Sequence, residues 1–304
     1  MSKTILVAGA ALLVAGGMGM YAWKEENRSP FLEIYAFNLK TSNALFIRTP
    51  GDKRILVDGG PNSAIVRKVT DILPFYSRRI DTILVSNPLG KNVAGLIDIL
   101  NRYDVEEVLI PAITLQTLSL SSTTDQIYDA FLETIKDRNI KLREFVEGDV
   151  LDLGVKIEIL FPATSSHFQY SKASAPEMIM KISHGKAFAL FLGTATTKIQ
   201  KYVAEQGTST ANVLFIWNNA SPDNLDQGLM EKVHPDYLVY SKSLTAVSRP
   251  PSEPAPGKKP KKVKTDPLLY LLEENRFNVR AYDFVKIVSD GEKLWLETKG
   301  ETTP

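Results

Sequence analysis

Short apolar runs alternate with helical patterns along most of this chain, and that alternation restricts its fold more than any other feature. Residues 80–86 are typical of a buried strand, and 93–103 follow with helical periodicity. Residues 105–110 are again strand-like, and 125–139 are again helical. Because the second half is richer in strands, we expect two β-sheets packed face to face, with helices on their outer faces.

The remaining elements are expected from the same periodicity and from turn residues. Strands are predicted at 31–37, 44–49, 54–57, 155–161, 177–183, 187–192, 213–217, 237–241, 279–282 and 294–297. Helices are predicted at 63–73, 198–205, 227–233 and from 266 to 275.

The amino-terminal segment has a different composition. Residues 5–23 carry no charge, and a helix of that length spans roughly 28 Å, close to the hydrocarbon core of a bilayer. Tyr21 and Trp23 stand where interfacial aromatic side chains are expected. We therefore expect residues 1–30 to form a single-pass membrane anchor and tether, with the globular domain outside the cytoplasm. The alternative is a cleaved signal peptide, which would also export the domain.

Charge and cysteine content exclude several kinds of function. The chain has 36 basic and 35 acidic residues, so its net charge of +1 creates no global field that would attract nucleic acid. It has no cysteine, which excludes disulfides, thiolate catalysis and cysteine-ligated zinc.

One local segment concentrates positive charge. Residues 249–264 contain five prolines and five lysines, so a disordered loop is predicted at about 244–264. The lysines are Lys258, Lys259, Lys261, Lys262 and Lys264. They predict salt-dependent, sequence-blind contact with DNA or another polyanion, and anionic lipid would be attracted by the same charges. The alternative is a solvated linker that binds nothing.

Two stretches carry a family resemblance. Residues 55–62 read ILVDGGPN, and residues 73–81 read LPFYSRRID. Together they resemble the metallo-β-lactamase fold, and in particular the extracytoplasmic hydrolase-like domain of the ComEC family of competence DNA-uptake proteins. The resemblance extends from about residue 31 to 297. It implies a four-layered αββα sandwich at 31–300, preceded by the transmembrane helix.

The resemblance also implies where metal ligands would stand, and this chain carries other residues there. The family motif Thr-His-Pro-Asp-Ala-Asp-His-x-Gly-Gly falls on residues 86–95, and later motifs fall after Gly193, after Trp217 and before Pro267. The former ligand positions are occupied by Asn87, Leu89, Lys91, Asn92, Thr194, Asn218, Asn219 and Asp266.

These residues are poor ligands for zinc or manganese, which favour imidazole and carboxylate groups. A cation such as Lys91 about 4 Å from a divalent ion would cost roughly 8 kcal/mol at an effective dielectric constant near 20. We therefore expect no metal, no cofactor and no metal-activated water. In the family, the aspartate at the position of Asp58 supports the metal loop. We expect Asp58, Gly59 and Gly60 to keep a structural role here.

Two other sets of residues are weaker candidates for metal binding or catalysis. His167, His184 and His234 share no spacing and are interpreted as surface residues. Ser86 with Lys91 would make a serine–lysine nucleophile pair, but no oxyanion hole is identifiable in the sequence.

The sequence therefore predicts a membrane-anchored pseudoenzyme that acts as a binding or scaffold protein, with a link to DNA uptake implied by the resemblance. Its cleft would be lined by Asn87, Lys91, Asn92, Thr194, Asn218 and Asn219, which are neutral groups around one cation and would suit an anionic ligand. A collapsed asparagine network is the alternative for the cleft. Alternative functions are a divergent metal-dependent phosphodiesterase or nuclease, and a structural subunit of an envelope protein complex.

Overall fold

The computed structural model describes residues 29–74, 76–112, 122–163, 177–207, 210–217, 224–241, 268 and 270–301. This part of the chain is built around two β-sheets. The first contains, in spatial order, β15 (Leu294–Glu301), β14 (Tyr282–Ser289), β1 (Leu32–Asn38), β2 (Asn43–Arg48), β3 (Arg54–Val57), β4 (Arg79–Leu84), β5 (Asp104–Pro111) and β6 (Lys141–Phe145). The second contains β13 (Arg276–Asn278), β12 (Tyr237–Tyr240), β11 (Val213–Ile216), β10 (Ala187–Gly193), β9 (Ile179–His184), β8 (Lys156–Phe161) and β7 (Val150–Asp152).

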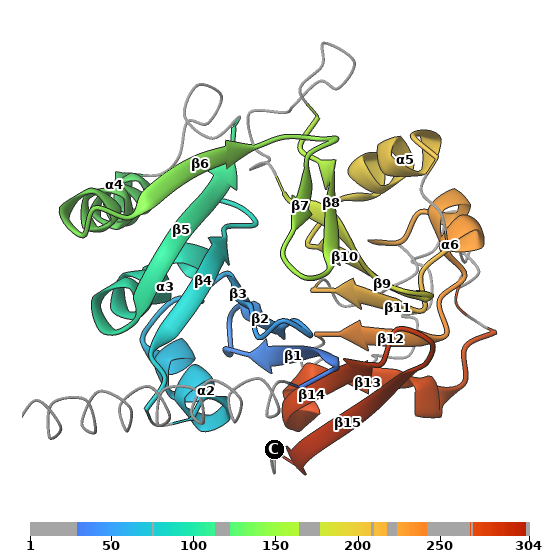
Figure 1. The fold of residues 1–304 in the computed structure, drawn as a ribbon. Helices are drawn as coiled ribbons and strands as arrows, with labels where there is room; N and C mark the ends of the chain where they lie inside the picture. Colours follow the sequence, from blue (N-terminus) through green and yellow to red (C-terminus); the bar gives the residue numbers. More distant parts are fainter. Residues whose placement is uncertain are drawn as a thin grey trace, which may run out of the picture.

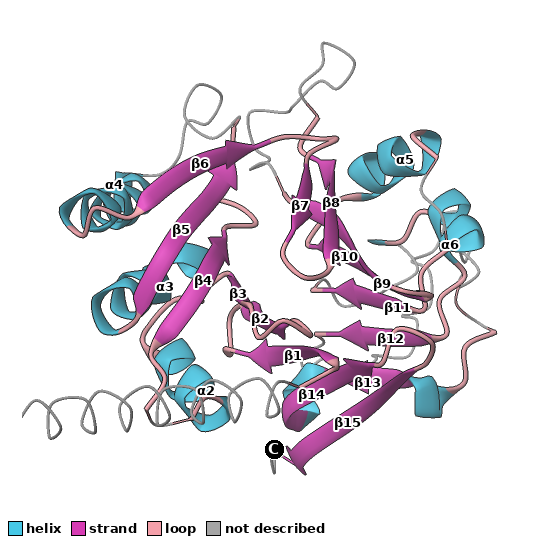
Figure 2. Ribbon diagram, viewed as in Figure 1, coloured by secondary structure: helices cyan, strands magenta, loops and turns pink. Residues whose placement is uncertain are grey.

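Helices cover the outer face of each sheet. Those on the first sheet are α2 (Ala64–Ile72), α3 (Gly90–Arg102) and α4 (Ser122–Asp137), and those on the second are α5 (Thr197–Glu205) and α6 (Gln227–Val233) (Figure 1). Figure 2 shows these helices on the two outer sides, with the strands between them. The expected mixed α/β architecture is confirmed, and its layers run helix, sheet, sheet, helix.

Alternating side chains fill three hydrophobic layers. In β3, Ile55 and Val57 face the core between the sheets, and Leu56 faces the layer beneath α2 and α3. In β11, Phe215 faces the core between the sheets and Leu214 faces α5 and α6. Successive side chains of a strand point to opposite faces, so a strand covered on both faces must be apolar throughout. This explains why these segments are continuous apolar runs in the sequence.

The carboxyl-terminal part of the domain differs from the expectation. The helix predicted to end at residue 275 is, among its described residues, only a short 3-10 turn at Glu273–Asn275. The strand predicted at 279–282 is a second 3-10 turn, Val279–Ala281, followed by β14. The intervening strand β13 was not predicted. Its three side chains are all half-buried, so it has neither an apolar run nor a clear alternation.

Strands β6 and β7 were also missed, for a related reason. They are the terminal strands of their sheets, and their sequences are rich in exposed positions. Helix α3 begins at Gly90, three residues earlier than expected, because the apolar periodicity starts only at Val93. Edge strands and polar first turns carry little hydrophobic signal.

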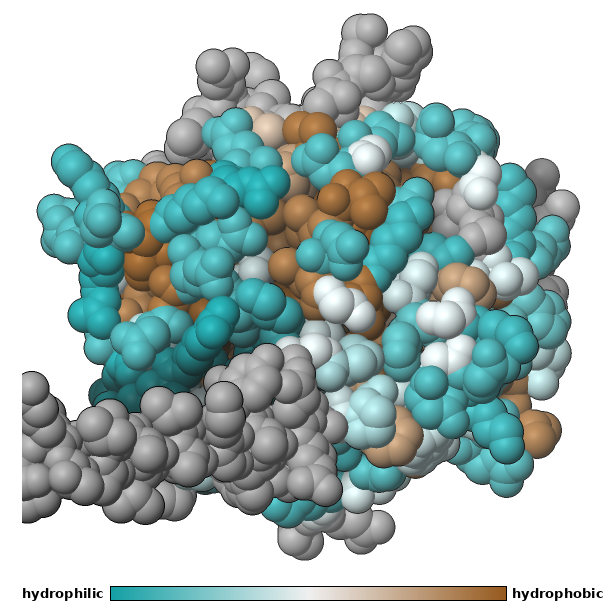
Figure 3. All heavy atoms as spheres, in the orientation of Figure 1, coloured by the Kyte–Doolittle hydropathy of each residue, from teal (hydrophilic) through white to brown (hydrophobic). Residues whose placement is uncertain are grey.

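Exposed apolar side chains mark these two edge strands. Leu142 of β6 and Val150 of β7 are both exposed, and four residues, 146–149, connect the strands. In Figure 3, apolar surface gathers in the upper middle of the molecule, over the region where Figure 1 places β6, β7 and β8. The polar surface lies mainly around that region.

The predicted anchor at 1–28 and the predicted loop at 244–264 lie outside the described residues, and so do their domain boundaries. Among the described residues, no helix is long and apolar enough to cross a bilayer. Both segments stay predictions from the sequence.

Two hairpin tips, one from each sheet, touch each other. Lys186, in the β9–β10 turn, donates its backbone N–H to the carbonyl of Gly291 in the β14–β15 turn, at 2.6 Å. A side chain at Gly185 would clash with that carbonyl, so the glycine allows the close approach. Beside this contact, His184 Nδ1 lies 3.2 Å from Ser289 Oγ.

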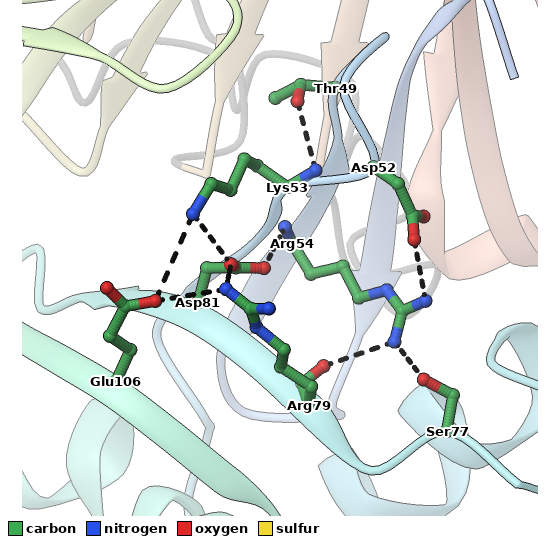
Figure 4. A network of polar contacts seen from close by, with 8 residues as sticks. All are labelled: Thr49, Asp52, Lys53, Arg54, Ser77, Arg79, Asp81 and Glu106. Atoms are coloured by element: carbon green, nitrogen blue, oxygen red, sulfur yellow. Dashed lines mark hydrogen bonds and ion pairs between the residues drawn. The ribbon is translucent and has the colours of Figure 1, made fainter. Parts of the chain in front are cut away.

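A charged network joins the starts of β3, β4 and β5 (Figure 4). Its centre is Asp81, whose side chain is 4% exposed and accepts from the Arg54 backbone N–H at 3.0 Å. Lys53 Nζ and Arg79 Nη2 contact the same carboxylate at 3.0 and 2.5 Å. Glu106, on β5, reaches both cations, but it is 61% exposed. The buried carboxylate of Asp81 therefore provides most of the link between the three strands.

Replacing Asp81 with alanine is expected to lower the free energy of unfolding by about 2–3 kcal/mol, because a buried backbone N–H and two cations lose their acceptor. Glu106→Ala is the matched control, and its loss should stay below about 1 kcal/mol because exposed ion pairs contribute little. Urea denaturation measures both. Equal losses would contradict a dominant role for Asp81.

Candidate functional site

Polar side chains meet where strands of both sheets end. Asp58 directly follows β3, Ser86 and Asn87 follow β4, and Thr194 follows β10. Glu177 precedes β9, which pairs antiparallel with β10. Asn92 comes from the first turn of α3. We call these six residues the central polar cluster: Asp58, Ser86, Asn87, Asn92, Glu177 and Thr194.

Asp58 holds one half of the cluster together. Its Oδ1 accepts from the Ser86 backbone N–H at 2.8 Å, and its Oδ2 accepts from the Ser86 hydroxyl at 2.5 Å. The Asn92 amide nitrogen donates to Ser86 Oγ at 3.2 Å and to Asp58 Oδ2 at 3.4 Å. All three residues are buried. These hydrogen bonds fasten the loop after β4 to the end of β3.

Glu177 organises the other half, and sequence reasoning did not find it. Asn87 Nδ2 donates to Glu177 Oε2 at 2.8 Å, and the Thr194 hydroxyl donates to the same oxygen at 2.7 Å. The Thr194 backbone N–H donates to Oε1 at 3.1 Å. The only sequence signal was a charge at the start of the apolar stretch 177–183. In the structure β9 begins at Ile179, so Glu177 lies on the approach to the strand.

Glycines let helix α3 pack directly on the loop after β3. The Gly59 N–H donates to the Asn92 carbonyl at 2.7 Å, and the Gly95 N–H donates to the Gly60 carbonyl at 2.9 Å. A Cβ on Gly59 would lie 2.6 Å from the Leu96 nitrogen, and one on Gly95 would clash with the Gly59 carbonyl. Two of the expected structural residues, Gly59 and Gly60, therefore lie in this contact, and the third, Asp58, reaches α3 through the Asn92 side chain.

Burial perturbs both carboxyl groups. It raises the pKa of Asp58 from 3.8 to about 8, although the hydrogen bonds from Ser86 oppose the shift. It also raises the pKa of Glu177, against the hydrogen bonds from Thr194 and Asn87. The Lys91 charge lowers both pKa values slightly. Lys91 itself is exposed. Burial therefore favours the protonated form of both carboxyl groups.

This geometry corrects the expected lining of the cleft. Neutral groups around one cation were predicted, whereas the central polar cluster contains two buried carboxyl groups, Asp58 and Glu177. Asn87 and Asn92 are buried and bonded to those groups, and Thr194 is half-buried. Glu177 was missed because it is 90 residues away from Asn87 in the chain.

Two other predicted positions lie outside the cluster, and the rest are not described. Leu89 and Lys91 line a shallow apolar depression of about 380 Å³, together with Pro61, Ala94 and Ile127. Asn218, Asn219, Asp266 and the five lysines between 258 and 264 fall outside the described residues. Trp217 is the last described residue before Asn218 and Asn219. Its backbone N–H donates to the Gly193 carbonyl at 2.7 Å.

The side chains present at this site do not fit a divalent metal. The oxygen of Asn87 already accepts from the Leu89 N–H at 3.1 Å, and its nitrogen donates to Glu177. Thr194 likewise directs its hydroxyl proton to the carboxyl group. Ligands must present lone pairs to a common point. Within the described residues, no three histidines, aspartates or glutamates are grouped so that they could hold an ion.

The alternative nucleophiles and ligands are not assembled either. Ser86 is buried and donates to Asp58, while Lys91 is exposed and makes no hydrogen bond to any described residue. Ser86 and Lys91 therefore form no hydrogen-bonded pair in this structure. His184 contacts Ser289, and His234 stacks on Tyr270 with ring centroids 4.1 Å apart. His167 lies outside the described residues.

No protein-family model matches the sequence, and no curated protein matches it. Several solved structures are similar in shape at low identity. A metal-dependent hydrolase of the beta-lactamase superfamily gives a TM-score of 0.48 at 10% identity, over 69% of this chain and 87% of the other. A diphosphatase of the PhnP family gives 0.41 at 13% identity, over 65% and 71%.

A mutant of the CmlA beta-hydroxylase gives a TM-score of 0.43 at 17% identity, over 69% of this chain. The match spans only 45% of that hydroxylase, so this chain covers less than half of its length. All of these TM-scores lie below 0.5.

The raised pKa of Asp58 predicts a dependence of stability on pH. Folded Asp58 keeps its proton up to about pH 8, whereas an unfolded carboxyl loses it near 3.8. The stabilisation that comes from protonated Asp58 is therefore complete below about pH 3.8, and it is lost as the pH rises to about 8. The slope reaches at most about 1.4 kcal/mol per pH unit.

In an Asp58→Asn variant this contribution is absent. The difference in unfolding free energy between wild type and variant should therefore shift in favour of the variant as the pH rises from about 4 to about 8. Urea denaturation at several pH values tests this. Parallel pH profiles for the two proteins would contradict a protonated, buried Asp58.

Proposed function

We propose that this protein is a catalytically inactive, metal-free relative of the metallo-β-lactamase-fold hydrolases that acts as a binding or scaffold protein at a membrane. One observation carries the proposal: Asn87, Asn92 and Thr194, at former ligand positions, donate hydrogen bonds to two buried carboxyl groups. These donors, with the backbone N–H groups of Ser86 and Thr194, already occupy all four carboxyl oxygens of Asp58 and Glu177, which would otherwise be the strongest ligands for an ion. The cluster therefore replaces a metal as the link between the loops.

Two observations support a metallo-β-lactamase fold for this chain. The strand order and the four layers form a sandwich of the expected kind. The motif at 55–62 supplies Asp58 and both glycines to the loop that contacts α3, which is the structural role that the resemblance implies for them. The ComEC-type relationship, and with it a role in DNA uptake, is the finer part of the proposal and comes from the sequence resemblance.

Metal analysis separates this proposal from a divergent phosphodiesterase or nuclease. The purified full chain, incubated with zinc or manganese and then dialysed, is expected to retain far less than one ion per chain by elemental analysis. It should also not hydrolyse a generic phosphodiester above the buffer rate. Glu177→Gln is the matched variant, because it removes one carboxyl group and conserves size. A stoichiometric ion that this variant loses, together with turnover, would establish the enzyme instead.

We place the partner-binding activity in the lysine segment 258–264 and the membrane attachment in residues 5–23. The supporting argument is compositional: the whole chain is nearly neutral, so attraction to a polyanion must come from a local concentration of charge. DNA is the polyanion that the resemblance suggests. An envelope protein complex is the alternative partner.

Salt dependence tests the lysine segment directly. Replacing Lys258, Lys259, Lys261, Lys262 and Lys264 with glutamine should reduce the slope of log affinity against log salt on duplex DNA by about 4–5, because five phosphates lose their counter-charges. The control variant changes five lysines scattered over the described domain: Lys136, Lys141, Lys156, Lys186 and Lys293. Gel shifts across a salt series measure both. An unchanged slope, or no binding by the wild type at low salt, would contradict the assignment.

A further inference from the structure

A second polar site lies on the helical side of the first sheet, at the strand end opposite the central polar cluster. It is a pocket of about 330 Å³ between α2, α3 and the loop that leads into β4. Arg78, from this loop, and Arg102, the last residue of α3, both line it. Ser77 and Tyr103 contribute hydroxyl groups. Four residues of the LPFYSRRID stretch, Leu73, Pro74, Ser77 and Arg78, thus line the pocket, and none of them belongs to the central polar cluster.

The two arginines of this pocket have no counter-charge within the part of the chain that the structure describes. Both are exposed, and neither guanidinium makes an ion pair or hydrogen bond to any residue that the structure describes. Among the described residues, no acidic side chain lines the pocket. In the adjacent network, by contrast, Arg54 pairs with Asp52 and Arg79 pairs with Asp81. Two permanently charged guanidinium groups around one pocket are stabilised by an anion.

The network in Figure 4 fixes the backbone on both sides of Arg78. The guanidinium of Arg54 donates to the Ser77 hydroxyl and, at 3.4 Å, to the carbonyl of Arg79. The carbonyl of Arg78 accepts from the Asp104 N–H at 2.7 Å. Because Ser77 Oγ accepts from Arg54, its own proton is available to a ligand.

The opposite wall is equally fixed. The hydroxyls of Thr70 on α2 and Tyr103 after α3 lie 3.0 Å apart, and Thr70 also donates to the Val66 carbonyl at 2.8 Å. Val66 and Leu73 add apolar surface to the lining. A pocket with a charged rim, a hydroxyl donor and an apolar wall is pre-organised for a small amphipathic anion.

We infer that this pocket binds a phosphate monoester. A dianionic phosphate balances the two guanidinium charges, and its tetrahedral oxygens can accept from Arg78, Arg102 and Ser77 together. The carbon skeleton of the ester would lie against Val66 and Leu73. The same chemistry occurs in soluble phosphate esters and in the headgroup of phosphatidic acid, and the experiment distinguishes these sources.

Calorimetric titration of the full chain with glycerol 3-phosphate at low salt is expected to show one site per chain. Arg78→Gln and Arg102→Gln should each weaken binding about tenfold or more, since each removes charge-assisted hydrogen bonds. Arg67→Gln is the matched control: Arg67 is exposed on α2 and does not line the pocket. Its affinity should equal that of the wild type. Unchanged melting temperatures would show that all three variants fold.

Parallel titrations with inorganic phosphate and with monomeric dihexanoyl phosphatidic acid identify the source. Tighter binding of the phosphatidic acid than of glycerol 3-phosphate supports a lipid headgroup, and equal or weaker binding supports a soluble ester. The inference is overturned if none of the three probes produces heat of binding. It is equally overturned if Arg67→Gln loses as much affinity as the two pocket variants.

Discussion

The hydrogen bonds between Asp58 and Ser86 are the constraint on which the arrangement of this domain depends. They join the ends of two neighbouring parallel strands, β3 and β4, inside the protein. The Ser86 carbonyl then accepts from the Met178 N–H at 2.8 Å, which ties this loop to the second sheet. In a low-dielectric interior each of these groups is costly unless it is paired, so the cluster holds as a unit.

The polar groups at the two ends of the first sheet are satisfied in different ways. At the carboxyl ends of β3 and β4, the polar groups are buried and satisfied by one another. At the opposite ends, Asp81 is buried but its cations reach solvent, where their charges remain hydrated. The apolar layers lie between these two polar ends. Hydrogen bonds from amide and hydroxyl donors to the two buried carboxyl groups thus tie the loops of the two sheets together.

Much of the fold was predictable because strands covered on both faces must be apolar throughout, and helices on the outside must be amphipathic. This rule located β3 and α6 at their observed limits. It failed for β6, whose first four residues are exposed, and near Val279, where a turn precedes β14. For the site, the sequence could locate residues that follow one another along a loop, such as Asn87 and Asn92. It could not locate Glu177, because only the packing of two sheets brings that residue to Asn87.

The position of β1 has a consequence for how the domain is made. β1 lies between β2 and β14, and Leu32 pairs with Ser289, near the other end of the domain. During synthesis, one edge of β1 stays open until the residues of β14 have left the ribosome. The Lys186–Gly291 contact between hairpin tips forms at the same late moment. Pairing of β1 on this edge thus waits for β14, and a nascent chain halted before residue 289 leaves an unpaired strand that can bind to another chain.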